Sequence, residues 1–300
     1  MRKIVSGIFI TSLLAAFYIL YGSPSEEIIK NIRIPEALLT LSAGSILAVS
    51  GVIYQNVLSN PLADPYILGI SAGSGLGAVI AFLTDKNPSS FAMIGGILII
   101  SIITFAAKIL NSKVKLILFG VGINALLSAL IVFLSAVGSN EKLPSVLFFL
   151  MGFIPITSLK TAFLLFLSST LLLFILIPFS KKADALSLGD SFAYFAGLTP
   201  EKERVILITI TSFFVALTIS FTGIIGFIGI VIPHIGRFLK ILRTKPLLIF
   251  SFFTGGNALL IAKAILKFLF PTLEVPVGVI VSLAGAPLFI TILVRSNRLA

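Results

Sequence analysis

The sequence predicts an all-α polytopic integral membrane protein with about ten transmembrane helices, one short re-entrant or periplasmic helix and two short cytoplasmic helices. Hydrophobic residues make up 58% of the 300 positions and charged residues 11%, and the mean hydropathy is +1.17. Apolar runs long enough to cross the hydrocarbon core recur along the whole chain, and inside a bilayer such runs satisfy their backbone as helices. We therefore expect one transmembrane domain over residues 1–300.

This composition excludes a soluble globular domain and a disordered chain. No soluble appendage is expected, so an ATP-binding module would have to be a separate chain.

The sequence has no cysteine, which excludes disulfides, thiolate metal sites and covalent thiol catalysis. Met1-Arg2-Lys3 before an apolar run resembles a signal peptide, but the run is long and no small-residue cleavage site follows it cleanly, so we interpret it as the first span.

The net charge of +11 is distributed as in a membrane protein rather than a nucleic-acid-binding one. If residue 1 is cytoplasmic, fifteen basic residues face inward and six outward, as the positive-inside rule requires. The inward set is Arg2, Lys3, Lys108, Lys113, Lys115, Lys181, Lys182, Lys202, Arg204, Arg237, Lys240, Arg243, Lys245, Arg295 and Arg298. The outward set is Lys30, Arg33, Lys86, Lys142, Lys160 and Lys267, with Lys263 deeper in a span. We expect a multi-pass protein of the cell membrane with both termini in the cytoplasm and no nucleic-acid partner.

Ten crossings satisfy both the hydropathy pattern and the charge pattern. The predicted spans are Ile4–Tyr21, Ala37–Leu58, Tyr66–Leu83, Phe91–Ala107, Leu116–Val137, Thr161–Phe179, Val205–Phe221, Thr222–Lys240, Leu247–Phe270 and Pro276–Val294. Pro35 lies at the start of the second span, a position that proline favours. Leu143–Met151 is too short to cross and is expected to be re-entrant or interfacial.

The second span and the turn after it contain an unusual number of polar and small residues. The span carries Ser42, Gly44, Ser50, Gly51, Tyr54 and Gln55. This pattern predicts a helix enclosed by others, with its polar groups facing neighbours or a pathway. In Asn60-Pro-Leu-Ala-Asp-Pro65 two prolines interrupt the helix, and the Asn and Asp side chains can satisfy the freed amides. The turn is either an ordinary tight connection or a constriction closed by its apolar tip, Leu62.

Small residues also mark the third and fifth spans. Gly69, Gly73 and Gly77 recur every four residues in the third, a spacing that lets helix backbones approach closely. Close packing is the first explanation and a glycine-lined cavity the second. The fifth span contains Gly120, Gly122, Asn124 and Ser128, and together with the second span it is our candidate for a pathway wall.

Lys181–Arg204 is the one long polar segment between two fully apolar blocks. Gly189 and Gly197 can stop a helix, and Thr199-Pro200-Glu201 can begin one, so two short helices fit the segment. Its apolar side chains are Leu186, Leu188, Phe192, Phe195, Ala196 and Leu198. A merely solvated loop has no need of them. The segment is either a docking site for another protein or a connection that lies on the lipid surface, and the residues alone favour neither.

Thr222–Lys240 is short, glycine-rich and broken by Pro233, yet it must cross because Arg237 and the basic residues after it face inward. It contains His234, the only histidine. A lone histidine beside a proline near a helix end is more often a hydrogen-bonded structural group than a ligand, because a metal or haem site would need partners that are absent here.

Several kinds of chemistry are missing from the sequence. There is no Gly-x-x-x-x-Gly-Lys-[Ser/Thr] phosphate loop, no His-Glu-x-x-His pair and no plausible Ser/His/Asp set. None of the eleven acidic residues falls in the middle of a predicted span; Glu36, Asp64 and Glu274 lie at span ends. Proton-coupled carriers generally need an intramembrane carboxylate or histidine relay. We therefore expect the energy to come from outside the chain, from an ATPase partner at Lys181–Arg204.

Four stretches resemble motifs of the FecCD-type permease family, the membrane subunits of binding-protein-dependent ABC importers for iron-siderophores, haem and cobalamin. They are Arg33-Ile-Pro-Glu36 with the small-residue helix after it, Val49–Gln55 continuing through Asn60–Pro65 to Leu68–Gly73, Gly226–Arg237, and Glu274–Gly278 with Gly285-Ala-Pro287. Leu188-Gly-Asp-Ser-Phe-Ala193 with Gly197 is similar to the family's segment that couples to the ATPase. The resemblance runs from about Arg33 to Arg295, and the Asn-Pro-Leu-Ala-Asp-Pro and Pro-His-Ile-x-Arg pieces are highly specific.

The resemblance implies half of a homodimeric pore, fed by an external substrate-binding protein and driven by two ATP-binding cassette subunits on the cytoplasmic side. ATP and magnesium would be bound by those subunits, and no cofactor or catalytic residue is expected on this chain. The implied roles are the inner gate and pathway for Gln55, Asn60, Pro61, Leu62, Asn124 and Ser128; the pathway wall and outer gate for the fifth span and Leu143–Met151; ATPase coupling for Leu188, Gly189, Asp190, Phe192, Ala193 and Gly197; docking of the binding protein for Arg33 and Lys267; and a structural motif for Pro233, His234 and Arg237.

The docking residues depart from the family's pattern. In relatives, outer arginines meet glutamates on the two lobes of the binding protein. Arg33 matches the first of these arginines, but Glu36 stands where a second is common and Lys267 where another often lies. Lysine can meet a carboxylate, although without the bidentate fork of arginine.

The predicted function is therefore an ATP-driven importer permease, and an iron-siderophore-type chelate is the first choice of substrate because that class is the most numerous. Cobalamin, haem and molybdate are alternatives within the family, since the binding protein does most of the selecting. A secondary transporter or channel is the alternative from another class. A membrane-embedded enzyme is a third, for which the sequence offers no catalytic set.

Overall fold

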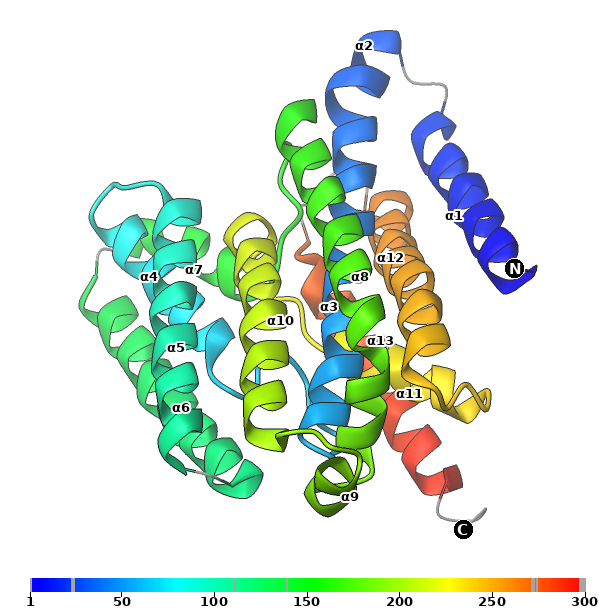
Figure 1. The fold of residues 1–300 in the computed structure, drawn as a ribbon. Coiled ribbons are helices and arrows are strands. Elements are labelled where there is room, and N and C mark those ends of the chain that lie inside the picture. The colour runs from blue at the N-terminus through cyan, green and yellow to red at the C-terminus, as the bar shows by residue number, and fades with distance from the viewer. Residues whose placement is uncertain are drawn as a thin grey trace. The chain divides into compact units, whose positions relative to one another are not determined.

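A computed structural model describes residues 2–22, 25–110, 112–138, 140–270, 273 and 275–296, and all regular structure in these ranges is helical (Figure 1). The all-α class predicted from the sequence is confirmed for this part of the chain. The elements are α1 (Arg2–Leu20), α2 (Glu26–Ile28), the π-helical turn η1 (Ile29–Arg33), α3 (Ile34–Val57), α4 (Ile70–Leu83), α5 (Pro88–Leu110), α6 (Lys113–Val137), the 3₁₀ turn η2 (Asn140–Lys142), α7 (Leu143–Leu150), α8 (Leu159–Ser187), α9 (Asp190–Phe195), α10 (Pro200–Thr222), α11 (Ile228–Phe238), α12 (Thr244–Leu269) and α13 (Val277–Ser296). Met1, Glu274 and Arg298, which the sequence analysis used, lie outside the described residues.

The apolar helices account for the predicted crossings. Within the described residues, six helices are long and apolar enough to cross a membrane by length and composition: Glu26–Val57, Pro88–Leu110, Lys113–Val137, Leu159–Ser187, Pro200–Thr222 and Thr244–Leu269. Four shorter apolar helices, Ile10–Leu20, Ile70–Leu83, Ile228–Phe238 and Val277–Thr291, occupy the positions of the other predicted spans. The short apolar segment predicted at Leu143–Met151 is the separate helix α7.

Two helix boundaries differ from the prediction for clear local reasons. The third span begins at Ile70 rather than Tyr66, because Pro65 interrupts the chain and Gly69 adopts a left-handed conformation with φ 81° before α4. The second span begins earlier than predicted. Ser25 accepts a hydrogen bond from the Ile28 N–H at 3.4 Å, and the helix then continues without a break to Val57. Glu36 therefore lies within a long helix and not at its end.

The chain forms two compact units, each assembled from separate parts of the sequence. The first unit comprises Met1–Val52, Ile154–Ser180 and Ile225–Ala300. In it α1 packs along α12, and α11, α12 and α13 pack on one another. Glycines set the closest approaches: a Cβ atom on Gly44 would collide with the Gly255 carbonyl, and one on Gly51 with the Gly229 carbonyl.

The second unit comprises Ile53–Phe153 and Lys181–Ile224. In it α4 packs closely along α5, with α6 and α10 against them (Figure 1). A Cβ atom on Gly73 would lie 2.9 Å from the Gly95 carbonyl oxygen, and one on Gly77 would collide with the carbonyl of Phe91. Close helix packing, the first explanation for these glycines, is confirmed. α7 and the residues just after it are joined to the chain that follows α10 by two backbone hydrogen bonds. The Phe153 N–H donates to the Thr222 carbonyl at 2.8 Å, and the Ile224 N–H donates to the Phe149 carbonyl at 3.2 Å.

The polar segment Lys181–Arg204 contains one separate short helix where the sequence predicts two. Its first part continues α8 to Ser187, because Ala183 and Leu186 are buried and prolong the apolar face of that helix. Gly189, with φ 106°, then starts α9, and Gly197, with φ 78°, follows its end. α10 begins at Pro200, as Thr199-Pro200-Glu201 predicts.

Candidate functional site

The turn after α3, Ser59–Pro65, is stiffened by its own side chains; we refer to it as the proline turn. Asn60 Oδ1 accepts a hydrogen bond from the Leu62 N–H at 2.9 Å, and the Asn60 carbonyl accepts one from the Ala63 N–H at 3.1 Å. Asp64 Oδ1 accepts a third from the Tyr66 N–H at 3.0 Å. The expectation that Asn60 and Asp64 satisfy the amides freed by the prolines is confirmed. The tip residue Leu62 is 47% exposed.

The chain that follows the proline turn packs against α6. A Cβ atom on Gly120 would lie 2.8 Å from the Leu68 Cα, and one on Gly69 would lie 3.5 Å from the Asn124 nitrogen. The segment just after the predicted gate residues and the fifth predicted span are thus close neighbours within one unit. Of the other pathway residues, Gln55 is buried, Asn124 is half-buried and Ser128 is exposed. The pathway roles of these three residues remain predictions.

The segment around α9 presents a surface of large apolar side chains, which we name the α9 surface. Leu188, Phe192, Tyr194 and Phe195 are all at least half exposed, and Phe195 is 92% exposed. Ala193 of the same helix is fully buried. The Tyr194 hydroxyl donates to both carboxylate oxygens of Glu201, at 2.7 and 2.8 Å, and this hydrogen bond raises the pKa of Tyr194. Exposed apolar side chains gathered on a polar segment are typical of a protein-binding surface.

Arg204, at the start of α10, connects the α9 segment to the end of α3. Its guanidinium is almost fully buried and contacts the Asp190 carboxylate at 2.6 Å through Nη2, while Nε donates to the Val57 carbonyl at 3.3 Å. A second contact joins the proline turn to the end of α8: the Ser59 hydroxyl donates to the Leu186 carbonyl at 3.0 Å. Lys182 and Glu203 form an ion pair beside it at 2.7 Å. The sequence shows Arg204 only as an inward-facing charge at the end of the polar segment, and these contacts were not predicted.

In the other unit, Glu36 is the centre of a charged group that we name the Glu36 cluster, formed with Tyr18, Arg33, Lys263 and Lys267. The carboxylate is buried and pairs with Lys263 at 2.8 Å and Lys267 at 3.0 Å, and it accepts a hydrogen bond from the Tyr18 hydroxyl. Arg33 donates to the Tyr18 carbonyl at 3.2 Å and lies over its ring. Two lysines pair with the one carboxylate and Arg33 lies beside Tyr18, so the cluster keeps a net positive charge.

Both predicted docking residues, Arg33 and Lys267, belong to the Glu36 cluster, which the sequence did not show. The Lys267 side chain forms an ion pair with Glu36. The residue that breaks the family's charge pattern, Glu36, is thus the one that fixes the lysine. Docking through Arg33 and Lys267 remains a prediction.

Pro233 and His234 pack against other residues of the fold. Pro233 is buried within α11, and the His234 ring packs edge-on against Phe289 with the ring centres 5.8 Å apart. His234 Nδ1 is buried without a hydrogen-bond partner in the described part of the chain, so packing holds the ring where we expected a hydrogen bond. In the ranges that the structure covers, no group of three or more His, Asp or Glu residues could hold a metal ion.

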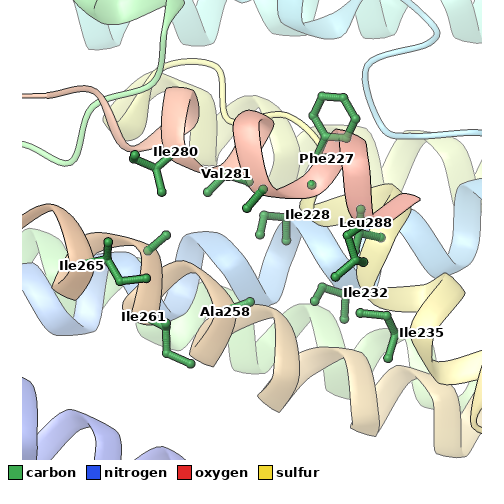
Figure 2. Close-up of a pocket in the computed structure, with 14 residues that line it drawn as sticks. Phe227, Ile228, Ile232, Ile235, Ala258, Ile261, Ile265, Ile280, Val281 and Leu288 are labelled. Carbon is green, nitrogen blue, oxygen red and sulfur yellow. The ribbon is translucent and has the colours of Figure 1, made fainter. Parts of the chain in front are cut away.

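An apolar pocket of about 230 Å³ lies between α11, α12 and α13 (Figure 2). Ile228 and Ile232 of α11 line it together with Ile261 and Ile265 of α12 and Ile280 of α13. Figure 2 shows these aliphatic side chains converging on the space, with Phe227 at its edge. The lining offers hydrocarbon rather than hydrogen-bonding groups, so it suits an apolar group and not a polar chelate.

Comparisons with known proteins match this chain over nearly its full length. A family model described as the FecCD transport family matches residues 3–295. A probable iron chelatin transport system permease protein of Helicobacter pylori strain J99 is 34% identical over 277 residues, covering 92% of this chain and 85% of the relative. The vitamin B12 import system permease protein BtuC of Escherichia coli O157:H7 is 32% identical over 284 residues, covering 92% and 86%.

Solved structures agree with these matches. A chain described as a metal-chelate type ABC transporter in an inward-facing conformation has a TM-score of 0.91 and 26% identity, covering 98% of this chain and 99% of that one. PsaBC from Streptococcus pneumoniae, solved in complex with a Fab, has a TM-score of 0.60 at 18% identity, covering 91% and 94% of the two chains, and shows the same fold.

Proposed function

Because the chain belongs to the FecCD transport family, we propose that it is the membrane-spanning permease subunit of an ATP-driven importer and that two copies of it form the pore. The α9 surface carries this proposal. It presents Phe192 and Phe195 on a polar segment between two apolar helices, where a separate ATPase subunit can dock. ATP and magnesium would then be bound by two such subunits and not by this chain.

The proline turn is the proposed inner gate. Its stiff backbone presents Leu62 at the tip, and in a homodimer each tip would face its symmetry mate. An apolar constriction of this kind can close a pathway by dewetting. Because Gln55 is buried and Ser128 is exposed, Asn124 and Ser128 on α6 are the better placed of the proposed wall residues.

The proposed substrate is an iron chelate of the siderophore type, delivered by an external binding protein. The Helicobacter pylori relative, described as an iron chelatin permease, supports this choice, and BtuC makes cobalamin the first alternative. Haem and molybdate remain further alternatives. We propose that the net positive Glu36 cluster, with Arg33 at its margin, receives carboxylates of the binding protein.

A secondary transporter is the alternative from another class. The structure places Glu36 inside a long helix, which is where a proton-relay carboxylate could lie. Two lysines and Tyr18 hold that carboxylate, however, and such pairing favours one permanent charge state over a switchable one. The Glu36 cluster is therefore better suited to a fixed structural and docking role.

The deciding experiment is co-purification of the chain with the candidate ATPase, followed by uptake into proteoliposomes. The binding protein would first be analysed by mass spectrometry to identify the chelate it carries. We expect uptake that requires ATP and the binding protein. Uptake driven by an ion gradient without ATP would exclude the importer, and cobalamin on the binding protein would change the substrate without changing the mechanism.

A further inference from the structure

The carbonyl of Val57, the last residue of α3, is one of the last four in that helix, and these have no donor within it. Pro61, four residues further on, has no N–H, so a further helical turn could not supply one either. Val57 is fully buried, and a buried carbonyl without a donor is unfavourable. Arg204 supplies the donor from Nε at 3.3 Å. The end of α3, two residues before the proline turn, is thus bound to α10 by a side chain.

The same guanidinium holds the first residue of α9. Arg204 Nη2 lies 2.6 Å from the carboxylate of Asp190. Arginine is suited to this position because its planar group directs donors toward two partners at fixed angles, which a lysine ammonium does not. A buried charge with two defined partners is costly to displace, so Val57 and Asp190 are held in one arrangement.

A second connection lies just before α9. Ser59 has φ 47°, a left-handed conformation that is unfavourable for a residue with a Cβ atom. Its hydroxyl donates to the Leu186 carbonyl in the last turn of α8 at 3.0 Å. The start of the α9 segment is therefore held by two contacts, from Leu186 to Ser59 of the proline turn and from Asp190 through Arg204 to Val57 at the end of α3.

We propose that Arg204 is a positioning residue that transmits displacement of α9 to the proline turn and so couples the ATPase to the gate. The inference rests on the proposed function, because it takes α9 as the ATPase contact. Hydrogen bonds within the turn make it move as a unit, so a shift at Asp190 reaches Leu62.

A fluorescent reporter at the gate tests this coupling without knowledge of the substrate. The chain has no native cysteine, so Leu62→Cys gives a single site for a bimane label before the ATPase is added. Emission is measured in proteoliposomes before and after the complex is trapped with ATP and vanadate. We expect a shift in the otherwise wild-type chain, and a shift reduced at least about fivefold by Arg204→Met or Arg204→Lys. Lys202→Met, an exposed change in the same helical turn, is the matched control and should preserve the shift.

The exchange Asp190→Arg with Arg204→Asp separates coupling from stability. It restores opposite charges but leaves the Val57 carbonyl without a donor, since a carboxylate cannot donate. We expect assembly with the ATPase to recover and the emission shift to stay lost. Recovery of the full shift by this exchange would overturn the proposal.

Failure of the inference and failure of the proposed function give different results. If the wild-type chain does not bind the ATPase, the proposed function fails and the inference fails with it. If it binds and Arg204→Met keeps the full shift, only the inference is overturned. Should Arg204→Met not assemble, Asp190→Asn and Ser59→Ala decide: a reduced shift in either supports the proposal, and a full shift in both overturns it.

Discussion

Replacement of Glu36 by glutamine tests the charged cluster around that residue. The carboxylate side chain is 6% exposed and is the common partner of Lys263 and Lys267, whose side chains are 14% and 26% exposed. Glutamine keeps the shape and can still accept a hydrogen bond from Tyr18, but it removes the negative charge. Two lysines then lie close together without the carboxylate that pairs with both.

The expected loss follows from the burial of these groups. Removing one partner of a fully buried ion pair costs about 3–5 kcal/mol. Both lysines reach some solvent and can relax toward it, so we expect a loss of about 2–4 kcal/mol for Glu36→Gln. At roughly 2–4 °C per kcal/mol, the midpoint of thermal inactivation should fall by roughly 5–15 °C.

The assay is the fraction of protein that remains monodisperse in detergent after heating, measured by size-exclusion chromatography. Glu27→Gln, an exposed change in the same long helix, is the matched control and should leave the midpoint unchanged. Adding Lys263→Met to Glu36→Gln should restore part of the loss, because it removes one of the two neighbouring positive charges. If Glu36→Gln is as stable as Glu27→Gln, the cluster contributes nothing and the reasoning is wrong.

Four further changes test other parts of the structure. Gly51→Ala should lower stability by about 2 kcal/mol or more, because its Cβ meets the backbone of α11, whereas Gly122→Ala, at an open position, should not; thermal midpoints decide. Gly189→Pro should uncouple ATP hydrolysis from uptake without unfolding the spans, because proline cannot adopt φ 106°, and unchanged coupling would contradict α9 docking. Leu62→Ser should raise the leak of a small polar dye from proteoliposomes while assembly stays normal, and no added leak would remove Leu62 from the gate. Burial raises the pKa of Asp64 from 3.8 to about 6, so its stabilising contribution is complete below pH 4 and is lost as the pH rises through 6; Asp64→Asn should abolish that loss, at most about 3 kcal/mol, in midpoints measured from pH 4 to 8.

The spans could be predicted because each one is defined by the hydropathy and charge of all its residues, so no single position decides the prediction. Boundaries were less certain where a single backbone conformation decides them, as at Gly69, whose left-handed φ delays α4. The continuation of α8 to Ser187 was missed because its last two turns are polar in composition. Ala183 and Leu186, three residues apart and both buried, were the available signal that an apolar face continues.

The Glu36 cluster could not be predicted from the sequence, because the two lysines that pair with Glu36 lie more than 200 positions from it in the chain. One part of it was visible. Lys263 and Lys267 are four residues apart and so share a face of one helix, which is a costly arrangement inside a membrane unless a carboxylate lies nearby. That argument requires a counter-charge but does not name Glu36.

The Arg204 contact, in contrast, had a local signal that applies to other chains. The last four carbonyls of a helix have no donor within it, and a proline four residues after the last one prevents another turn from supplying it. A buried carbonyl at that position must therefore find a donor elsewhere. Val57 and Pro61 have this spacing. Arg204 lies where the polar segment Lys181–Arg204 meets the apolar part of α10, and it is a suitable donor. A water molecule would satisfy the same carbonyl without joining two segments. The choice of a charged side chain, itself held by Asp190, makes the end of α3 depend on the position of α9. This dependence is what a subunit without its own energy source needs if a partner is to open its gate.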